Sequence, residues 1–411
     1  MRVVYVCLLW AWCLAAQAQS LDALVAEALR NNREILAAQK RYEAARERPG
    51  QESSLPDPTV SVGWVSNGNP LPGAGLGTSV TSNIGLMVSQ EMPFPGKRKL
   101  RGEIAAREAD AEFQQYLAVR RSVVARLKQA YHMLHHAREA MDTVIENQAL
   151  LHNFIQVAEV RYSVGRAAQQ DIFRAQTQYA IYEAQRLRLE QERISREAEM
   201  NSLLNRPPGG SFQLPDELTP PPLDVTLEQL RARSRTQAPQ LRRDQKVIER
   251  SELAADLARR DYYPDYTVSG GYFNQGGMPP MYEVRLDVKL PAYFWRKQRA
   301  ALNEQADRIR EARHSYEAEQ QTLDARIQDD FVTAQTSMRL MDLYQKSVIP
   351  SAKLALESSM ASYETGALEF LSLLTNFMTV VDYELNYHEE MMRYYLALDR
   401  LEEVTGLLLD R

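Results

Sequence analysis

The stretch from Lys97 to Arg161 contains no proline, and Gly102 is its one interior glycine. A helix of this length would extend about 100 Å at about 1.5 Å per residue, too long for an ordinary globule. Its apolar residues recur at the steps of three, four and seven that are typical of a coiled coil. They are Phe113, Leu117, Val124, Leu127, Tyr131, Leu134, Met141 and Ile145. The pattern predicts a helical hairpin or a cylinder of helices, because so long a helix needs neighbours along its whole length.

The sequence consists of two similar halves on either side of a proline-rich linker. The turn sequence Tyr162-Ser163-Val164-Gly165 in the first half corresponds to Tyr363-Glu364-Thr365-Gly366 in the second. We therefore predict a duplication in which each half contributes a helix, a β-hairpin and a helical hairpin. The predicted segments are a first repeat 19–204 with a β-hairpin 59–91 and a helical hairpin 97–204, a linker 205–225, and a second repeat 226–411 with a β-hairpin 267–290 and a helical hairpin 296–409.

The last predicted strand alternates strictly between apolar and charged residues. Tyr282, Val284, Leu286, Val288 and Leu290 alternate with Glu283, Arg285, Asp287 and Lys289. Such a strand has one apolar and one charged face, as expected for a barrel with lipid outside and water inside, or for a soluble sheet over a core. Four strands cannot close into a barrel within one chain, and aromatic residues flank them as in an interfacial girdle. We therefore favour a barrel shared by several chains.

The N-terminal residues resemble a cleavable export signal. Arg2 precedes an apolar run, and Ala16-Gln17-Ala18 provides the small residues of a signal-peptidase site, so residues 1–18 are predicted to be removed. Both cysteines, Cys7 and Cys13, lie in this segment, and neither follows the small residue that lipidation requires. No later stretch has the length and apolarity of a transmembrane helix.

Composition excludes several other classes of function. The net charge of −5 is unfavourable for nucleic-acid binding. No nucleophile, phosphate loop or cysteine set supports catalysis, so we predict no enzyme activity, no cofactor and no resident metal site. His132, His135 and His136 lie at helical spacing, but solvated helix histidines explain them better than a metal contact does.

The ordered set of repeats, strand hairpins and Tyr-x-x-Gly turns resembles the TolC-type outer-membrane efflux protein family. The segment Gln90–Arg98, with the sequence QEMPFPGKR, is more similar to the heavy-metal efflux branch of that family. The resemblance implies a mainly helical fold in which long antiparallel helical hairpins form a periplasmic α-barrel. It also implies that three chains pool their four strands into a twelve-stranded outer-membrane β-barrel.

The resemblance further implies partners and site residues. The chain would form a homotrimer in outer-membrane lipid and receive substrates from an inner-membrane pump of the RND type through a periplasmic adaptor. Adaptor-contacting turns would contain Tyr162, Gly165 and Gly366, and the periplasmic gate would involve Asp171 bonded to Tyr363, with Ser372 and Thr375 nearby. Asp171 as a simple helix N-cap is the alternative. The family's gating arginine and aspartate ring are replaced here by Leu368, Ser372 and Thr375. The charges at 283, 285, 287 and 289 would face the lumen.

Three alternatives remain open at this point. A type I protein secretion system or a drug efflux system would use the same kind of exit duct. A periplasmic coiled-coil adaptor would also contain long helices, but it would require a lipoyl-like or β-barrel domain between the hairpin arms, which the sequence lacks. The sequence does not identify the exported substrate.

Overall fold

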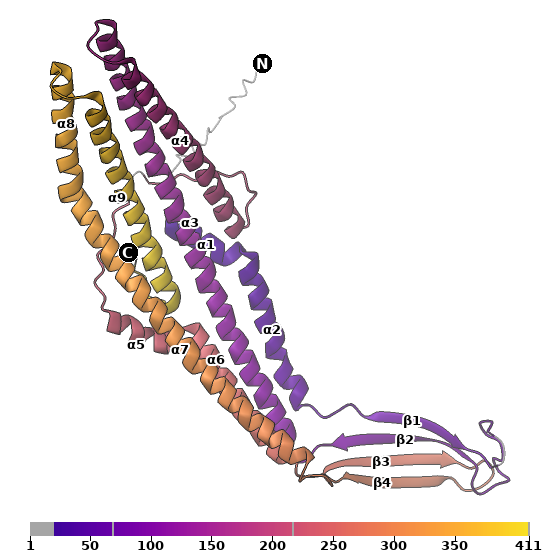
Figure 1. Ribbon diagram of the computed structural model, residues 1–411. Helices are drawn as coiled ribbons and strands as arrows, with labels where there is room; N and C mark the ends of the chain where they lie inside the picture. The colour runs from indigo at the N-terminus through magenta and orange to yellow at the C-terminus, as the bar shows by residue number, and fades with distance from the viewer. Residues whose placement is uncertain (1–19, 68–69, 216–217, 410–411) are drawn as a thin grey trace, which may run out of the picture. The chain divides into compact units, whose positions relative to one another are not determined.

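The computed structural model describes residues 20–67, 70–215 and 218–409, so the predicted signal segment 1–18 lies outside the described residues. The chain combines long helices with one four-stranded antiparallel sheet, which confirms the predicted fold class for the single chain (Figure 1). The helices are α1 (Leu21–Asn31), α2 (Arg33–Ser53), α3 (Lys97–Ser163), α4 (Gln169–Leu203), α5 (Leu227–Gln237), α6 (Pro239–Arg260), α7 (Lys297–Leu343), the π-helix η1 (Tyr344–Val348), α8 (Ile349–Thr365) and α9 (Phe370–Thr405). The strands are β1 (Thr59–Val65), β2 (Asn83–Met92), β3 (Asp265–Asn274) and β4 (Met281–Lys289).

Two compact units divide these elements. Among the described residues, the helical unit comprises 20–37, 118–215, 218–238 and 322–409. The strand unit comprises Ala38–Leu117 and Pro239–Gln321, and it contains the whole sheet. Each unit takes segments from both predicted repeats, so long-range packing joins the two halves of the sequence. Within the described residues, none of the helices has an apolar stretch of the length that a bilayer crossing requires.

The sheet of the strand unit has the order β1-β2-β3-β4, with every neighbouring pair antiparallel. Its register aligns Val62 with Leu86, Leu86 with Tyr272, and Tyr272 with Tyr282. Because side chains directly opposite each other share a face, most apolar positions of the four strands fall on one side of the sheet, while Met87 and Phe273 fall on the other. The outer edges of β1 and β4 pair with no other described strand.

The helices break at positions that the sequence prediction treated as continuous. The predicted first helix is two helices, α1 and α2, separated at Asn32. The Asn32 Oδ1 accepts hydrogen bonds from the amides of Glu34 and Ile35 at 2.9 and 3.1 Å, so this side chain caps α2. Likewise α5 ends before Ala238, whose extended backbone is the conformation favoured before Pro239.

A π-helical turn interrupts the long helix of the second repeat. The predicted continuous helix is divided into α7, η1 and α8, and η1 ends just before Pro350. Proline lacks the backbone N–H, and its ring clashes with the carbonyl of the preceding turn. The wider π turn relieves that clash without ending the helix, which explains the irregularity at this position.

The apolar core of the helical unit lies between its two helical hairpins. Side chains of α3, α4, α8 and α9 form one buried cluster, in which the Phe154 and Phe377 rings meet edge to face with centroids 5.4 Å apart. A second cluster joins α7 to α9, and the Tyr394 hydroxyl donates to the carbonyl of Pro221 at 2.6 Å. The proline-rich linker is therefore fastened to α9.

Candidate functional site

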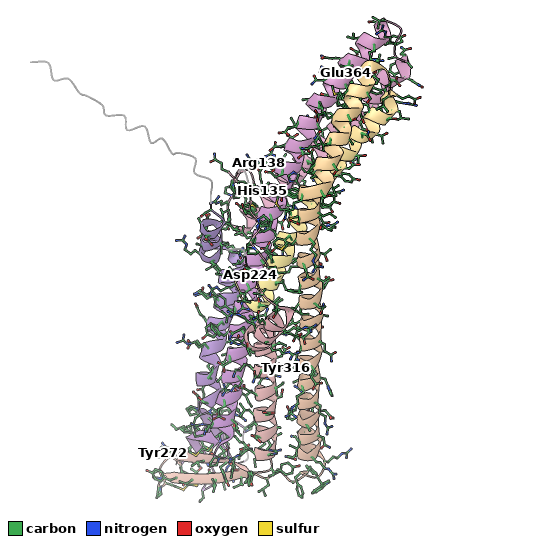
Figure 2. The ribbon with its side chains drawn as sticks, turned by 90° about the vertical axis from the view of Figure 1, so that its left-hand side faces the viewer. His135, Arg138, Asp224, Tyr272, Tyr316 and Glu364 are labelled. Carbon is green, nitrogen blue, oxygen red and sulfur yellow. The ribbon has the colours of Figure 1, made fainter. Side chains whose placement is uncertain are left out.

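The two inter-helix turns of the helical unit have the same geometry. Gly165 and Gly366 adopt left-handed backbone conformations, with φ of 74° and 85°. In each turn the residue after the glycine donates its amide to the carbonyl five residues earlier, from Arg166 to Arg161 at 2.8 Å and from Ala367 to Ser362 at 2.9 Å. This is the Schellman arrangement, which favours glycine at the left-handed position. Figure 2 labels Glu364, beside the second turn, at one end of the helical unit.

Arg161 joins the two turns directly. Its guanidinium donates to the carbonyl of Glu364 at 3.0 Å and to that of Tyr363, at the C-terminal end of α8. The same guanidinium carbon lies 4.6 Å from the centroid of the Tyr363 ring. A cation is favoured at a helix C-terminus and over an aromatic face, so three interactions act together. Sequence reasoning missed Arg161, although it directly precedes the Tyr-x-x-Gly motif.

The predicted bond between Asp171 and Tyr363 is not formed in this chain. Tyr363 is 4% exposed, and its hydroxyl has no hydrogen-bond partner among the described residues. Burial raises the pKa of Tyr363; the Arg161 charge opposes the rise and the Asp171 charge adds to it. The N-cap alternative is also wrong, because Ala168 is the N-cap of α4 and Asp171 lies in its first turn.

A polar cavity of about 340 Å³ lies between the two turns. Its walls include Arg161, Asp171, Tyr363 and Leu368. Ser372 and Thr375 are exposed on α9, and the Thr375 hydroxyl donates to the carbonyl of its own helix at Leu371. The structure thus brings Asp171 and Tyr363 together with Arg161 at one site. Ser372 and Thr375 do not line this cavity.

We expect Arg161→Ala to loosen the contact between the two turns. Hydrogen bonds from a charged donor contribute about 1.5–3 kcal/mol each, and no other described side chain replaces this one at the Tyr363 and Glu364 carbonyls. Amide hydrogen exchange at 161–171 and 360–370 should accelerate at least tenfold. Arg166→Ala is the matched control, since Arg166 lies in the same turn but is exposed. Equal exchange in both variants would remove Arg161 from this role.

The charged face of β4 lies opposite its apolar face, as predicted. Glu283, Arg285, Asp287 and Lys289 occupy alternate positions, and Arg285 pairs with Asp287 at 2.9 Å. On the other side Val284 is 86% exposed, although it is in the middle of a strand. Most other large apolar side chains of that face are also exposed. They are Val60, Val62, Trp64, Ile84, Leu86, Val88, Val268, Tyr272, Tyr282, Leu286 and Val288.

Four histidines lie where α3 packs against α9: His132, His135 and His136 on α3, and His388 on α9. The prediction that the three histidines of α3 are solvated is wrong for His132 and His135. These two are 3% and 2% exposed. His132 Nδ1 is 2.9 Å from a carboxylate oxygen of Asp399, and its ring stacks on Tyr395. Figure 2 labels His135 on α3. Among the described residues no group of three or more His, Cys, Asp or Glu side chains is arranged to hold a metal ion.

We expect the helical unit to lose stability between pH 6.5 and pH 4. Burial lowers the pKa of His135 and that of His388 to about 4, against 6.5 for an unfolded histidine. The unfolded chain therefore takes up protons first as the pH falls, and the stability present above about pH 6.5 is lost toward pH 4. The loss is about 3 kcal/mol for His135, at about 1.4 kcal/mol per pKa unit.

Unfolding by denaturant at a series of pH values checks this expectation. The double variant His135→Asn/His388→Asn should show a flatter pH dependence over this window, whatever its stability at pH 7. His314→Asn is the control, because the His314 side chain is 79% exposed. An unchanged slope in the double variant would contradict the assignment.

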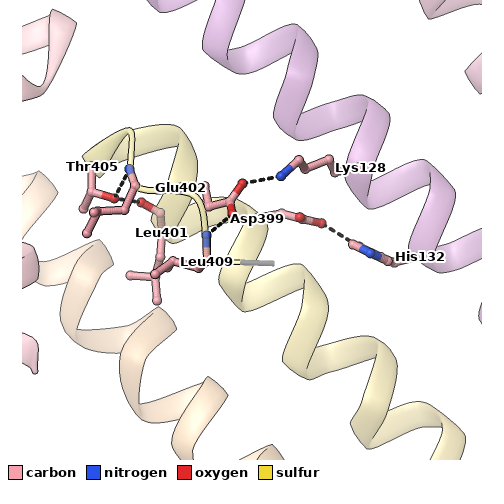
Figure 3. Close-up of polar contacts among 8 residues, drawn as sticks. Lys128, His132, Asp399, Leu401, Glu402, Thr405 and Leu409 are labelled. Atoms are coloured by element: carbon pink, nitrogen blue, oxygen red, sulfur yellow. Dashed lines mark hydrogen bonds and ion pairs between the residues drawn. The ribbon is translucent and has the colours of Figure 1, made fainter. Parts of the chain in front are cut away.

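A buried ion pair and a buried hydrogen bond also connect α3 to α9 (Figure 3). Lys128 Nζ lies 2.5 Å from Glu402, one turn from the pair of His132 and Asp399. All four side chains are nearly inaccessible to solvent, so the pairs fix how these helices align rather than form a surface site.

Comparison with known protein families gives one match. The sequence model of the outer membrane efflux protein family matches residues 24–206 and 230–407. No curated protein matches the chain.

Several solved structures share the fold. CusC superposes with a TM-score of 0.80 at 16% identity, covering 95% of this chain and 92% of CusC. The outer membrane protein VceC of Vibrio cholerae gives 0.79 at 17%, with 96% and 98% covered. The Campylobacter jejuni CmeC outer membrane channel gives 0.80 at 17%, with 96% and 87% covered. At these identities the likeness shows the fold.

Proposed function

Because the chain belongs to the outer membrane efflux protein family, we propose that it is the passive exit duct of a tripartite efflux system. In this proposal three copies close a twelve-stranded barrel in the outer membrane, and their helices line a periplasmic tunnel. The observation that supports it is the exposed apolar face that continues over all four strands, opposite a face that bears charges. Water cannot stabilise so large an apolar face, and lipid can.

The open edges of β1 and β4 support the shared barrel. No backbone hydrogen-bond partner for a sheet edge exists inside a bilayer, so a membrane sheet must close. The edge of β4 in one copy can pair with the edge of β1 in the next. We also retain the two repeats, 19–204 and 226–411 with the linker 205–225, as part of the proposal; the shared geometry of the two turns supports it.

Membrane fractionation tests the proposal. We expect the full chain in the outer-membrane fraction, as a species that runs as a trimer on unheated gels and as a monomer after boiling. A protein recovered as a periplasmic monomer would refute the duct.

The turns at Gly165 and Gly366 are proposed to contact a periplasmic adaptor that leads to an RND-type inner-membrane pump. Tyr162 is 45% exposed at the first turn and is available for that contact. The gate is proposed to involve Arg161 together with Asp171 and Tyr363, with Ser372 and Thr375 exposed beyond them on α9. Site-specific photocrosslinking from position 162 should capture the adaptor, whereas crosslinking from exposed Arg310 on α7 should not.

We propose metal cations as the exported class, supported by the segment Gln90–Arg98 quoted above. Deletion of the gene should sensitise cells to metal salts without sensitising them to drugs. Sensitivity to drugs alone, or loss of a secreted protein, would favour the drug efflux or type I secretion alternative.

A further inference from the structure

An apolar cavity of about 660 Å³ lies in the strand unit, where the sheet meets the start of α3. Its floor is the apolar face of the sheet, at Tyr266, Val268 and Leu286. The sheet register places these side chains together, because Val268 pairs with Leu286 and Tyr266 pairs with Met92. The cavity is therefore a hollow in the apolar face of the sheet, the face that we assign to lipid.

The wall of the cavity is built by the turn that connects β2 to α3. Pro93, Phe94 and Pro95 line it, and the Phe94 ring stacks on Tyr263 at 4.6 Å with an interplanar angle of 13°. The amide of Phe94 donates to Asp265 Oδ1 at 2.8 Å, and buried Lys97 holds the same oxygen at 2.9 Å. The wall is therefore fixed by packing and by hydrogen bonds, not formed by a loose loop.

Two basic residues, Arg98 and Lys99, also line the cavity. No hydrogen bond or ion pair joins the Arg98 guanidinium to another described residue. Lys99 has an ion pair with Glu103 at 3.6 Å, but the Lys99 side chain is 80% exposed, and such surface pairs contribute little. The side chains of Arg98 and Lys99 can therefore turn toward an anion at the opening of the cavity.

Apolar walls continuous with a lipid-facing sheet, next to two available cations, match the chemistry of an anionic phospholipid. We infer that this cavity binds an anionic glycerophospholipid of the leaflet facing the periplasm, with acyl chains on Val268 and Leu286 and the phosphate at Arg98 and Lys99. The inference rests on the proposed function, which places the helix end of the sheet at that leaflet. Basic residues beside a bilayer bind anionic headgroups by the same electrostatics.

The aromatic residues around this end of the sheet agree with a headgroup boundary. Tyr263, Tyr293, Phe294 and Trp295 are all at least half exposed. Tyrosine and tryptophan are enriched where the apolar core of a membrane meets its headgroups. A phosphate at Arg98 would therefore lie at the depth expected for a headgroup.

Native mass spectrometry of the full-length protein extracted from defined vesicles tests the inference. The vesicles contain phosphatidylethanolamine with or without one fifth phosphatidylglycerol. We expect the wild type to retain phosphatidylglycerol in preference to phosphatidylethanolamine, and Arg98→Gln/Lys99→Gln to lose about fivefold of that preference per residue. Arg98→Lys should keep it, because the charge remains. Arg308→Gln/Arg310→Gln on exposed α7 removes the same charge elsewhere and should change nothing.

The outcomes separate this inference from the proposed function. Trimers that form in both vesicles but retain the two lipids equally, or an Arg98→Gln/Lys99→Gln variant that retains phosphatidylglycerol like the wild type, would overturn the lipid site and leave the duct intact. If no trimer forms in any vesicle, the duct proposal fails, and the lipid site fails with it.

Discussion

Val284→Arg should abolish the trimer. Val284 is the most exposed of the apolar strand residues and pairs with Gly270 midway along β4. An arginine on the lipid face costs about 2–4 kcal/mol at the midplane of the bilayer. Three copies of the chain incur that cost together in the assembled barrel, which is comparable with the whole stability of a typical domain. We expect no heat-sensitive trimer band and degradation of the exported chain.

Glu283→Arg is the matched control for this prediction. It introduces the same residue at the adjacent position, but on the charged face of β4. Since that face is assigned to water, the trimer should form at the wild-type level. Equal loss in both variants would point to a general defect in β4, and equal assembly in both would show that Val284 does not face lipid.

The four strands show how much of this fold can be predicted from the sequence. Strict alternation of apolar and charged residues is clear only in β4, and the alternation is weaker in β1, β2 and β3. Pairing nevertheless aligns their apolar positions with those of β4, since a one-residue slip would move every side chain to the other face. The two-residue period therefore predicts the sheet better as a set than any single strand does.

Helix breaks and burial were harder to predict, for a physical reason. A cap such as Asn32 is a single side chain, and its Nδ2 donates to Leu203 far along the chain at 2.8 Å. His132 appeared solvated because its partner Asp399 lies on α9, which the local sequence does not reveal. The break at Ala238 and the π turn before Pro350 have a local signal, in the proline that follows each of them.

At the candidate site, too, features set by neighbouring residues could be predicted from the sequence, whereas contacts between distant residues could not. The turns at Gly165 and Gly366 are predicted from the repeated Tyr-x-x-Gly motif, and both glycines adopt the left-handed conformation that favours this residue type. The contact that joins the turns was assigned to Asp171 and Tyr363, but Arg161 provides it. An arginine reaching backbone carbonyls of another helix leaves no signature, since the carbonyls of any sequence would accept the bond.

Lys128→Met should destabilise the helical unit by about 3–5 kcal/mol, the usual effect of removing one partner of a buried pair. The side chains of Lys128 and Glu402 are 6% and 8% exposed, so the Glu402 carboxylate would stay buried without the charge of Lys128 beside it. Thermal or denaturant unfolding of the full chain measures this loss. Arg126→Met is the control, because Arg126 pairs with Glu34 at 2.6 Å on the surface and its loss should cost less than about 1 kcal/mol.

The double variant Lys128→Met/Glu402→Gln decides which contribution is larger, the attraction between Lys128 and Glu402 or the cost of burying the Glu402 charge. Glu402 also accepts a hydrogen bond from the Leu409 amide, and a glutamine carbonyl can still accept it. If desolvation is the larger contribution, neutralising both partners should recover most of the stability lost in Lys128→Met. A double variant as unstable as the single one would instead show that the attraction itself holds α3 against α9.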